Sequence, residues 1–263
     1  MSLVAALRAA GCVFAEEEAA LILDTASGPD EADRMTARRV AGEPLEHVLG
    51  WAAFLGTRVA VGPGVFVPRR RTEFLAEHAL RLMRPGAVAV DLCCGSGALG
   101  AALARGGAGE VHAADLDPAA VECARRNLGP LGVPVHRGDL FAALPAALRG
   151  RVDILVANVP YVPTGDVPLL PTEAREHEPL LSLDGGDDGL GVLRRVAGGA
   201  ADWLAPGGVL LSETSERQSA AACAAFAAAG LDARLAEDDE LGATVVLGRQ
   251  AGGVRASRRS SRG

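Results

Sequence analysis

The sequence predicts an α/β protein built on a doubly wound, mostly parallel seven-stranded sheet. After Pro85-Gly86, short apolar segments alternate with helical ones, as in parallel sheets that helices cover on both faces. A glycine-rich loop follows the first of these strands, at the place where such sheets open a crevice for a ligand. The expected strands are 87–92, 110–115, 133–137, 152–157, 207–213, 231–236 and 243–248, and the expected helices are 97–105, 117–128, 188–204 and 215–229.

Local signals support individual elements of this domain, which we place at residues 72–250. Asp117-Pro118 is a typical helix start, because Asp caps the helix and Pro fits its first turn. Only a short acidic turn, Glu237 to Glu240, separates the last two strands, which predicts that they pair antiparallel. A further helix is expected over 72–83, with Phe74, Leu75, Ala79 and Leu82 on one side.

The N-terminal part has a different pattern. Residues 1–50 are predicted to form a small domain of short helices, which Gly28-Pro29-Asp30 interrupts. Residues 51–71 are predicted to link the two domains through a β-hairpin, in which alternating valines at 59, 61, 65 and 67 flank a Gly62-Pro63-Gly64 turn. Residues 251–263 hold four arginines among Gly and Ser and are predicted to be a disordered basic tail.

Composition limits the function classes. The chain has 263 residues, of which 49% are hydrophobic, enough for one large domain and a small one. Its net charge of −7 is evidence against general nucleic-acid binding. The five cysteines form no paired framework and the N-terminus is no signal peptide, so we expect a cytoplasmic protein. No apolar run reaches the roughly 18 residues of a membrane span, and the scattered histidines predict no metal site.

The glycine loop predicts a nucleoside cofactor. Residues 95–100 satisfy G-x-G-x-x-G, and Asp115 lies twenty residues after Gly95, at the end of the second strand. Glycines let the backbone approach a ligand, and an acid at this position can accept both ribose hydroxyls. These features fit a nicotinamide dehydrogenase as well as an S-adenosylmethionine (AdoMet) enzyme.

Three further features favour AdoMet. Asp91 ends the first strand, where a carboxylate suits a cationic amino-acid moiety and would repel a pyrophosphate. Asp139 ends the third strand, where an adenine amine can donate to it. The fourth strand ends in Asn158-Val159-Pro160-Tyr161, a segment that hydride transfer does not need.

The Asn158–Tyr161 segment suits methylation of a planar nitrogen. The lone pair of an amide or exocyclic amine is delocalised, so a site helps by accepting hydrogen bonds from both N–H groups and aligning the nitrogen. The Asn158 side-chain oxygen and the Val159 carbonyl are the expected acceptors. Pro160 stiffens the loop, and Tyr161 stacks on the planar group.

Together these motifs resemble the HemK/PrmC-type protein-glutamine methyltransferases, which methylate the Gln of the Gly-Gly-Gln motif of peptide-chain release factors. The resemblance covers roughly residues 35 to 249. The matching segments are 39–45 with His47 and Gly50, 67–73, the DLCCGSG loop at 91–97, 158–161, Glu178-Pro179, 183–190 and 204–208.

The resemblance implies a Rossmann-like AdoMet-dependent methyltransferase with an N-terminal helical domain for substrate recognition. The implied partner is a release factor, with no membrane, metal or direct nucleic-acid partner, and a monomer is favoured. The expected acceptor site comprises Asn158, Val159, Pro160, Tyr161 and Glu178. The expected cofactor residues are Asp91, Cys93, Cys94, Gly95, Ser96, Gly97, Asp115, Leu116, Asp139, Leu140 and Asn158.

The chain departs from the family pattern at three places. Val159 replaces the first Pro of Asn-Pro-Pro-Tyr, which leaves the carbonyl but adds an N–H and frees φ. Cys93 stands where the family has its first loop glycine, and Arg70-Arg71 replace Pro-Asp in Pro-Arg-Pro-Asp-Thr-Glu. Amino-methylation of a small molecule or a nucleic-acid base therefore stays open, as do a non-catalytic binding module and a nicotinamide oxidoreductase.

Three other segments have ordinary interpretations. The acids at 184, 187 and 188 lack the order of a calcium loop and suit a solvated turn. A single histidine between two acids, as in Glu176-His177-Glu178, is more typical of an exposed surface segment than of an acid–base catalytic site or a metal site. Arg69 to Arg71 fit either a docking patch for an acidic or RNA-bound partner or an ordinary exposed run.

Overall fold

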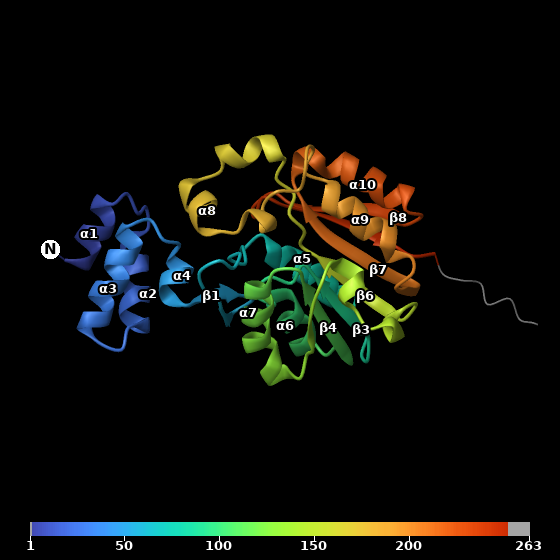
Figure 1. Cartoon of the computed structure of the whole chain (residues 1–263), viewed down its shortest axis with the longest axis horizontal. Helices are drawn as coiled ribbons and strands as arrows, with labels where there is room; N and C mark the ends of the chain where they lie inside the picture. The colour runs from blue at the N-terminus through green and yellow to red at the C-terminus, as the bar shows by residue number, and fades with distance from the viewer. Residues whose placement is uncertain (1, 252–263) are drawn as a thin grey trace, which may run out of the picture.

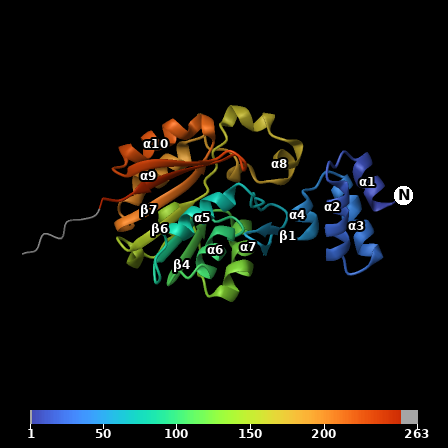
Figure 2. The same cartoon turned by 180° about the vertical axis from the view of Figure 1, so that it is seen from behind.

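The computed structural model describes residues 2–251, which form an N-terminal helical bundle, a short hairpin and a larger domain around a sheet (Figure 1). The bundle lies at one end of the molecule, and the reverse view shows the last strands far from it (Figure 2). Residues 252–263 of the predicted basic tail lie outside the described residues. Within the described chain, none of the helices combines the length and apolarity needed to cross a bilayer.

The bundle confirms the short helices expected for the first fifty residues. It has its own apolar core, in which Leu7, Ile22 and Met35 pack together. The predicted interruption at Gly28-Pro29-Asp30 is shorter than expected, because Pro29 and Asp30 already belong to the next helix and Pro29 fits its first turn. The helices are α1 (Leu3–Ala9), α2 (Ala15–Thr25), α3 (Pro29–Val40) and α4 (Leu45–Leu49).

The hairpin lies earlier than predicted. Strands β1 (Trp51–Phe54) and β2 (Thr57–Ala60) pair antiparallel. Leu55 and Gly56, both with positive φ, form the two-residue turn that matches strand twist. A turn does form at Gly62-Pro63-Gly64, where the Val65 N–H donates to the Gly62 carbonyl at 3.1 Å and Gly64 has a φ of 75°. The residues that flank this turn do not pair as strands, so the predicted hairpin around it is wrong. The valines around it alternate because they are buried, and Val61, Val65 and Val67 pack with Cys123 in a small cluster.

The sheet confirms the predicted doubly wound fold, with strand order β5-β4-β3-β6-β7-β9-β8. All neighbours are parallel from β5 to β7, and β9 pairs antiparallel with both β7 and β8. The strand order reverses between β3 and β6, so their carboxyl ends flank the point where ligands bind in such sheets. The strands are β3 (Val88–Leu92), β4 (Glu110–Asp115), β5 (Val135–Arg137), β6 (Val152–Ala157), β7 (Leu204–Thr214), β8 (Asp232–Asp238) and β9 (Ala243–Arg249).

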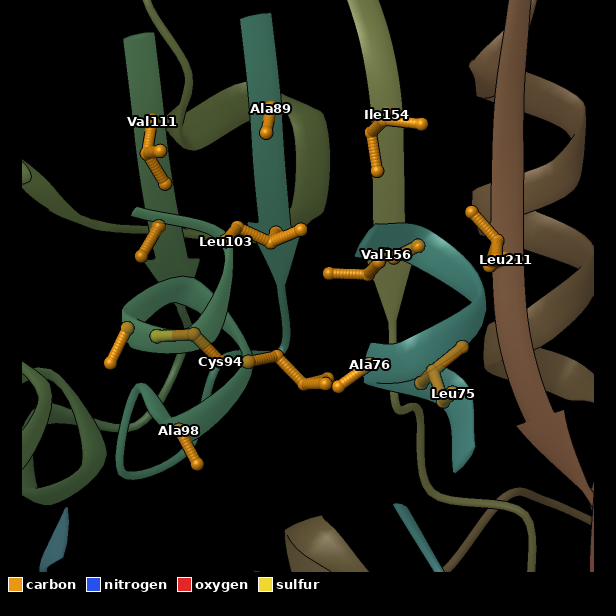
Figure 3. Close-up of a cluster of buried hydrophobic side chains, with 14 of the residues drawn as sticks. Leu75, Ala76, Ala89, Cys94, Ala98, Leu103, Val111, Ile154, Val156 and Leu211 are labelled. Carbon is orange, nitrogen blue, oxygen red and sulfur yellow. The ribbon is translucent and has the colours of Figure 1, made fainter. Parts of the chain in front are cut away.

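Helices cover both faces of the sheet. One core cluster joins α5 (Thr72–Leu82), α6 (Ala98–Arg105) and α7 (Pro118–Leu128) to one face. In Figure 3, Leu75 and Ala76 of α5 and Leu103 of α6 lie over side chains of β3, β4, β6 and β7. A second cluster joins α9 (Gly191–Ala200) and α10 (Ser219–Ala228) to the other face. Short 3₁₀ turns occur at Gly129–Leu131, Leu140–Ala143, Ala146–Leu148, Thr164–Leu169, Leu180–Ser182 and Glu216–Gln218.

The segment between β6 and α9 extends toward the bundle and contains α8 (Thr172–His177) (Figures 1 and 2). Arg39 of α3 ties the two together, because its guanidinium lies 2.7 Å from the Glu18 carboxylate and 3.5 Å from that of Glu173 in α8. The bundle is thereby placed beside the crevice that the strand order creates.

Candidate active site

A cavity of about 600 Å³ opens at the carboxyl ends of β3, β4 and β6. Its walls come from the loops after these strands, from the linker that leads into α5, and from the segment that carries α8. The glycine loop and Asn158 therefore line one continuous space, as the sequence predicts. An asparagine remote from the nucleoside crevice would have contradicted the prediction.

The loop after β3 is sharply turned. Cys93, Gly95 and Gly97 all have positive φ, at 56°, 54° and 81°. A side chain at Gly97 would lie 2.9 Å from the Leu128 side chain, so this glycine allows α6 to pack closely against α7. Gly97 is not part of the cavity wall, whereas Cys93, Cys94, Gly95 and Ser96 are. Burial raises the pKa of the Cys93 thiol, which keeps it neutral.

Asp115 ends β4 and faces the cavity beside the loop. Its two carboxylate oxygens accept hydrogen bonds from the backbone N–H groups of Gly95 and Asp117, each at 2.9 Å. Burial raises its pKa, and these hydrogen bonds oppose the shift. A carboxylate has about four acceptor sites, so two remain for a diol in the cavity.

Asp91 lies behind the loop. It is fully buried, its Oδ2 accepts the Gly100 N–H at 2.7 Å, and its Oδ1 has no partner among the described residues. Burial raises its pKa to about 7, and the nearby Asp115 charge adds to this shift. Asp91 does not line the cavity, so direct contact with a cofactor stays a prediction.

The far side of the expected cofactor site is formed by Leu116, Asp139 and Leu140, all of which line the cavity. Asp139 carries a 2.5 Å ion pair to Arg195, which also faces the cavity. The Asp139 side chain is half exposed, so its carboxylate has room for a second donor. Its predicted contact with an adenine amine stays a prediction.

The Asn158–Tyr161 segment forms the opposite wall. The Asn158 Nδ2 donates to the Thr72 hydroxyl at 3.3 Å, while its Oδ1 accepts no hydrogen bond from the described residues and is not buried. The Val159 carbonyl likewise has no partner there, and the Val159 side chain is buried in the core. Two hydrogen-bond acceptors thus stand free beside the cavity, and their predicted contact with the substrate nitrogen stays a prediction.

Three residues that sequence reasoning missed hold this segment. The Tyr161 hydroxyl donates to Glu213 at 2.9 Å and accepts a hydrogen bond from Arg71 at 2.7 Å. Glu213 also accepts from Arg71 Nε and from the Thr72 hydroxyl. The available signal was a single acid inside the apolar strand β7, since an unpaired buried carboxylate is costly.

Glu178 anchors the linker. Its buried carboxylate accepts from the Val67 N–H at 3.1 Å and from Arg69 at 2.6 Å. Burial raises its pKa and the Arg69 charge opposes this. Glu178 lines the cavity, and its predicted contact with the substrate stays a prediction. Arg69 and Arg71 are thus both committed to internal ion pairs, with Glu178 and Glu213, which argues against a freely exposed basic run.

The other acidic segment has structural roles. Asp184 accepts from Thr164 and from the Gly186 N–H, and Asp188 pairs with Arg194. No cluster of potential ligands suited to a metal ion occurs within residues 2–251. The interpretation of the acids at 184–188 as a turn agrees with these contacts.

Comparison with known proteins identifies methyltransferases as the relatives of this chain. A family model described as "Methyltransferase domain" matches residues 89–177. Two release factor glutamine methyltransferases are similar to this chain. The one from Streptomyces coelicolor is 41% identical over 70% of this chain and 67% of its own length, and the one from Bradyrhizobium diazoefficiens is 36% identical over 83% and 82%.

A third relative has a different acceptor. The 4-amino-L-phenylalanine/4-methylamino-L-phenylalanine methyltransferase of Streptomyces pristinaespiralis is 42% identical over 73% of this chain and 68% of its own length. Among solved structures, the T. thermophilus 16S rRNA N2 G1207 methyltransferase in complex with AdoMet and guanosine matches with a TM-score of 0.55. It is 25% identical and covers 76% of this chain and 49% of that one.

The sequence similarity extends over most of this chain and most of its relatives, and the fold agrees with a methyltransferase domain. The chain belongs to the HemK/PrmC-type release factor glutamine methyltransferase family.

Proposed function

We propose that this enzyme transfers a methyl group from AdoMet to the side-chain amide nitrogen of a glutamine in a protein, and that the protein is a peptide-chain release factor. The observation that carries the proposal is the pair of free acceptors, Asn158 Oδ1 and the Val159 carbonyl, in the same cavity as the glycine loop. The relatives from Streptomyces coelicolor and Bradyrhizobium diazoefficiens are named release factor glutamine methyltransferases, which supports a release-factor glutamine as the methyl acceptor.

The residues of the cofactor half fit AdoMet. Loop 93–96 brings backbone to the cavity, Asp115 offers two acceptor sites, and Asp139 faces the same space. Asp115 and Asp139 are two carboxylates on one wall, of which Asp139 is paired with Arg195, and the remaining negative charge suits a nucleoside that carries positive charge. When bound, AdoMet supplies an electrophilic methyl group on a sulfonium.

The acceptor half then works by positioning. Two oxygens that accept from both N–H groups of a primary amide fix its plane and point the nitrogen in one direction. The same oxygens stabilise positive charge that develops on that nitrogen in the transition state. Tyr161 is itself fixed by Glu213 and Arg71, so its ring is a rigid wall for a planar group.

The experiment is methylation of purified release factor with AdoMet labelled in the methyl group. We expect label on the glutamine of the Gly-Gly-Gln motif, located by mass spectrometry of the tryptic peptide. A release factor with that glutamine changed to alanine is the control. Wild-type enzyme that binds AdoMet but leaves the glutamine unlabelled would refute the release-factor proposal.

A second acceptor class has one specific observation in its favour. The Streptomyces pristinaespiralis relative is as similar as the release-factor enzymes and acts on an aromatic amine. Arg71 lies in the cavity wall beside Tyr161, and its Nε and one Nη are bound to Glu213 and Tyr161. Its other Nη has no partner among the described residues and can pair with a carboxylate of a free amino acid. The same assay should therefore include 4-amino-L-phenylalanine, and label on that compound alone would identify a small-molecule enzyme.

A further inference from the structure

Glu213 is the centre of a buried hydrogen-bond network behind the acceptor segment. Its side chain is only 2% exposed and lies in β7, 141 residues along the chain from Thr72. Oε2 accepts from the Thr72 hydroxyl at 2.6 Å. Oε1 accepts from Arg71 Nε and from the Tyr161 hydroxyl, both at 2.9 Å. Both oxygens of this carboxylate are therefore occupied by donors.

The network has only one possible direction at Thr72. A carboxylate has no hydrogen to give, so the single Thr72 hydroxyl hydrogen must point to Glu213. The hydroxyl then offers only a lone pair to its other neighbour, which is the Asn158 amide at 3.3 Å. Of the two ends of that amide, only the NH₂ group can donate to a lone pair. The amide oxygen must consequently face the other way, toward the cavity.

We propose that Thr72 and Glu213 are positioning residues that set the orientation of the Asn158 amide and so make its oxygen, not its NH₂ group, the group presented to the acceptor nitrogen. This inference rests on the proposed function, because it assumes that the acceptor nitrogen donates to Asn158. It adds two residues, from α5 and β7. Thr72 lines the cavity beside Asn158, whereas Glu213 lies behind the cavity wall.

The orientation matters because an asparagine amide is nearly symmetric in shape and opposite in chemistry at its two ends. A rotated amide would place N–H against the N–H of the acceptor and lose one of the two hydrogen bonds that align the nitrogen. Losing one preorganised group of this kind lowers kcat by roughly 10²- to 10³-fold in other enzymes. If the Asn158 amide rotates freely instead of being fixed the wrong way round, its oxygen still faces the acceptor part of the time. The fall in kcat is then smaller, about tenfold.

The first test removes the hydroxyl at constant shape. Thr72→Val should lower kcat about tenfold or more, with the AdoMet dissociation constant unchanged within about twofold. Thr72→Ser restores a hydroxyl and should recover most of the rate. Thr36→Val is the matched control, because Thr36 also loses a buried hydroxyl bond, to the Ala32 carbonyl at 2.7 Å, but lies in the bundle core away from the cavity. Equal rates for Thr72→Val and Thr36→Val would overturn the proposal.

The second test reverses the direction of the network. In Glu213→Gln, the glutamine oxygen can still accept from Arg71 and Tyr161, while its NH₂ group donates to Thr72. The Thr72 hydroxyl is then free to donate onward, which turns the wrong end of Asn158 to the cavity. Asn158→Asp places an oxygen at both ends of the side chain. In the native network it is unfavourable, because the new carboxylate and Glu213 then compete for the single Thr72 hydroxyl hydrogen. In the reversed network it is favourable, because the Thr72 hydroxyl can donate to the new carboxylate.

We therefore expect each single variant, Glu213→Gln and Asn158→Asp, to lose roughly 10²-fold in kcat, and the double variant to be at least about tenfold faster than Asn158→Asp alone. The double variant carries one carboxylate, as the wild type does, whereas Asn158→Asp carries two. The matched control is therefore Asn158→Asp with Glu213→Ala, which has the same charge as the double variant but no NH₂ group that can donate to Thr72, and which should not recover. Additive losses in the double variant would overturn the proposal. Misfolding of Glu213→Gln does not remove the test, since the Thr72 variants decide the same point.

A readout without any acceptor separates this inference from the proposed function. The side-chain ¹⁵N–¹H signals of Asn158, assigned by their loss in Asn158→Asp, should shift and exchange faster in Thr72→Val because one N–H loses its partner. An unchanged Asn158 signal would overturn the positioning role whatever the acceptor is. If the Asn158 signal changes in Thr72→Val but the wild-type enzyme labels neither release factor nor 4-amino-L-phenylalanine, the positioning role of Thr72 stands and the proposed function is refuted.

Discussion

Asp115 provides the sharpest test of the cofactor half. We expect Asp115→Ala to weaken AdoMet binding before it affects anything else in catalysis. The carboxylate accepts backbone N–H groups from Gly95 and Asp117, which leaves about two acceptor sites directed at the cavity. The substitution removes both free sites and also releases the loop from its anchor.

The magnitude follows from the number of lost hydrogen bonds. A hydrogen bond to a charged group contributes about 1.5 to 3 kcal/mol, so two of them contribute about 3 to 6 kcal/mol. The dissociation constant for AdoMet should therefore rise by roughly 10²- to 10⁴-fold. Loss of the two backbone contacts should in addition lower the free energy of unfolding by about 1 to 3 kcal/mol.

The assay is isothermal titration calorimetry with S-adenosylhomocysteine and AdoMet on protein shown to be folded by circular dichroism. Asp153→Ala is the matched control, because its carboxylate also accepts a backbone N–H, from Val88 at 2.9 Å, but at the opposite end of the strands. It should lose stability and keep cofactor affinity. Folded Asp115→Ala that binds AdoMet as tightly as Asp153→Ala would refute the assignment of the ribose site.

The remaining predictions concern the acceptor, the buried acid and the loop. Asn158→Ala should lower kcat by roughly 10²-fold or more and leave AdoMet affinity within about twofold, measured by initial rates and calorimetry; normal turnover would show that the acceptor site is misplaced. Asp91 has a pKa raised from 3.8 to about 7 in the folded protein, so its contribution to stability is present at acid pH and lost as pH rises through 7. Relative to Asp91→Asn, the wild-type free energy of unfolding should fall by up to roughly 4 kcal/mol between about pH 4 and about pH 8, measured by denaturant unfolding at each pH. If the two proteins differ by the same free energy at every pH in this range, the raised pKa of Asp91 is contradicted. Gly97→Ala should cost roughly 2 kcal/mol of stability, since its φ is +81° and the new carbon meets Leu128 at 2.9 Å. Gly95→Ala, with positive φ but open space, should cost about half as much, and equal melting temperatures for the two variants would refute the packing argument.

Much of the sheet domain was predictable because its signals are local. Apolar runs bounded by glycine and aspartate placed all the strands of the sheet, and the acidic turn before Leu241 correctly indicated an antiparallel final pair. The N-terminal hairpin was misplaced because buried extended chain and paired strand share the same alternation. The turn that joins the paired strands, at Leu55-Gly56, lacks the usual Asn-Gly signal.

The cofactor wall and the acceptor segment were also predictable, since both follow directly after strands. The support of the acceptor segment was not. Thr72 and Glu213 are ordinary residues within a helix and a strand, and only the folded sheet brings them to Asn158. The substitution of Arg at position 71 was visible in the sequence, but its bond to Tyr161 was not.

The network around Glu213 also bears on how the enzyme matures. Residues 91–140 can assemble the nucleoside wall among themselves, whereas the methyl-acceptor wall is incomplete until β7 has joined the sheet. Contacts so distant in sequence form late, because the long loop between them must close first. A chain whose last third has not yet joined the sheet should therefore already capture its cofactor before it gains the ability to use it.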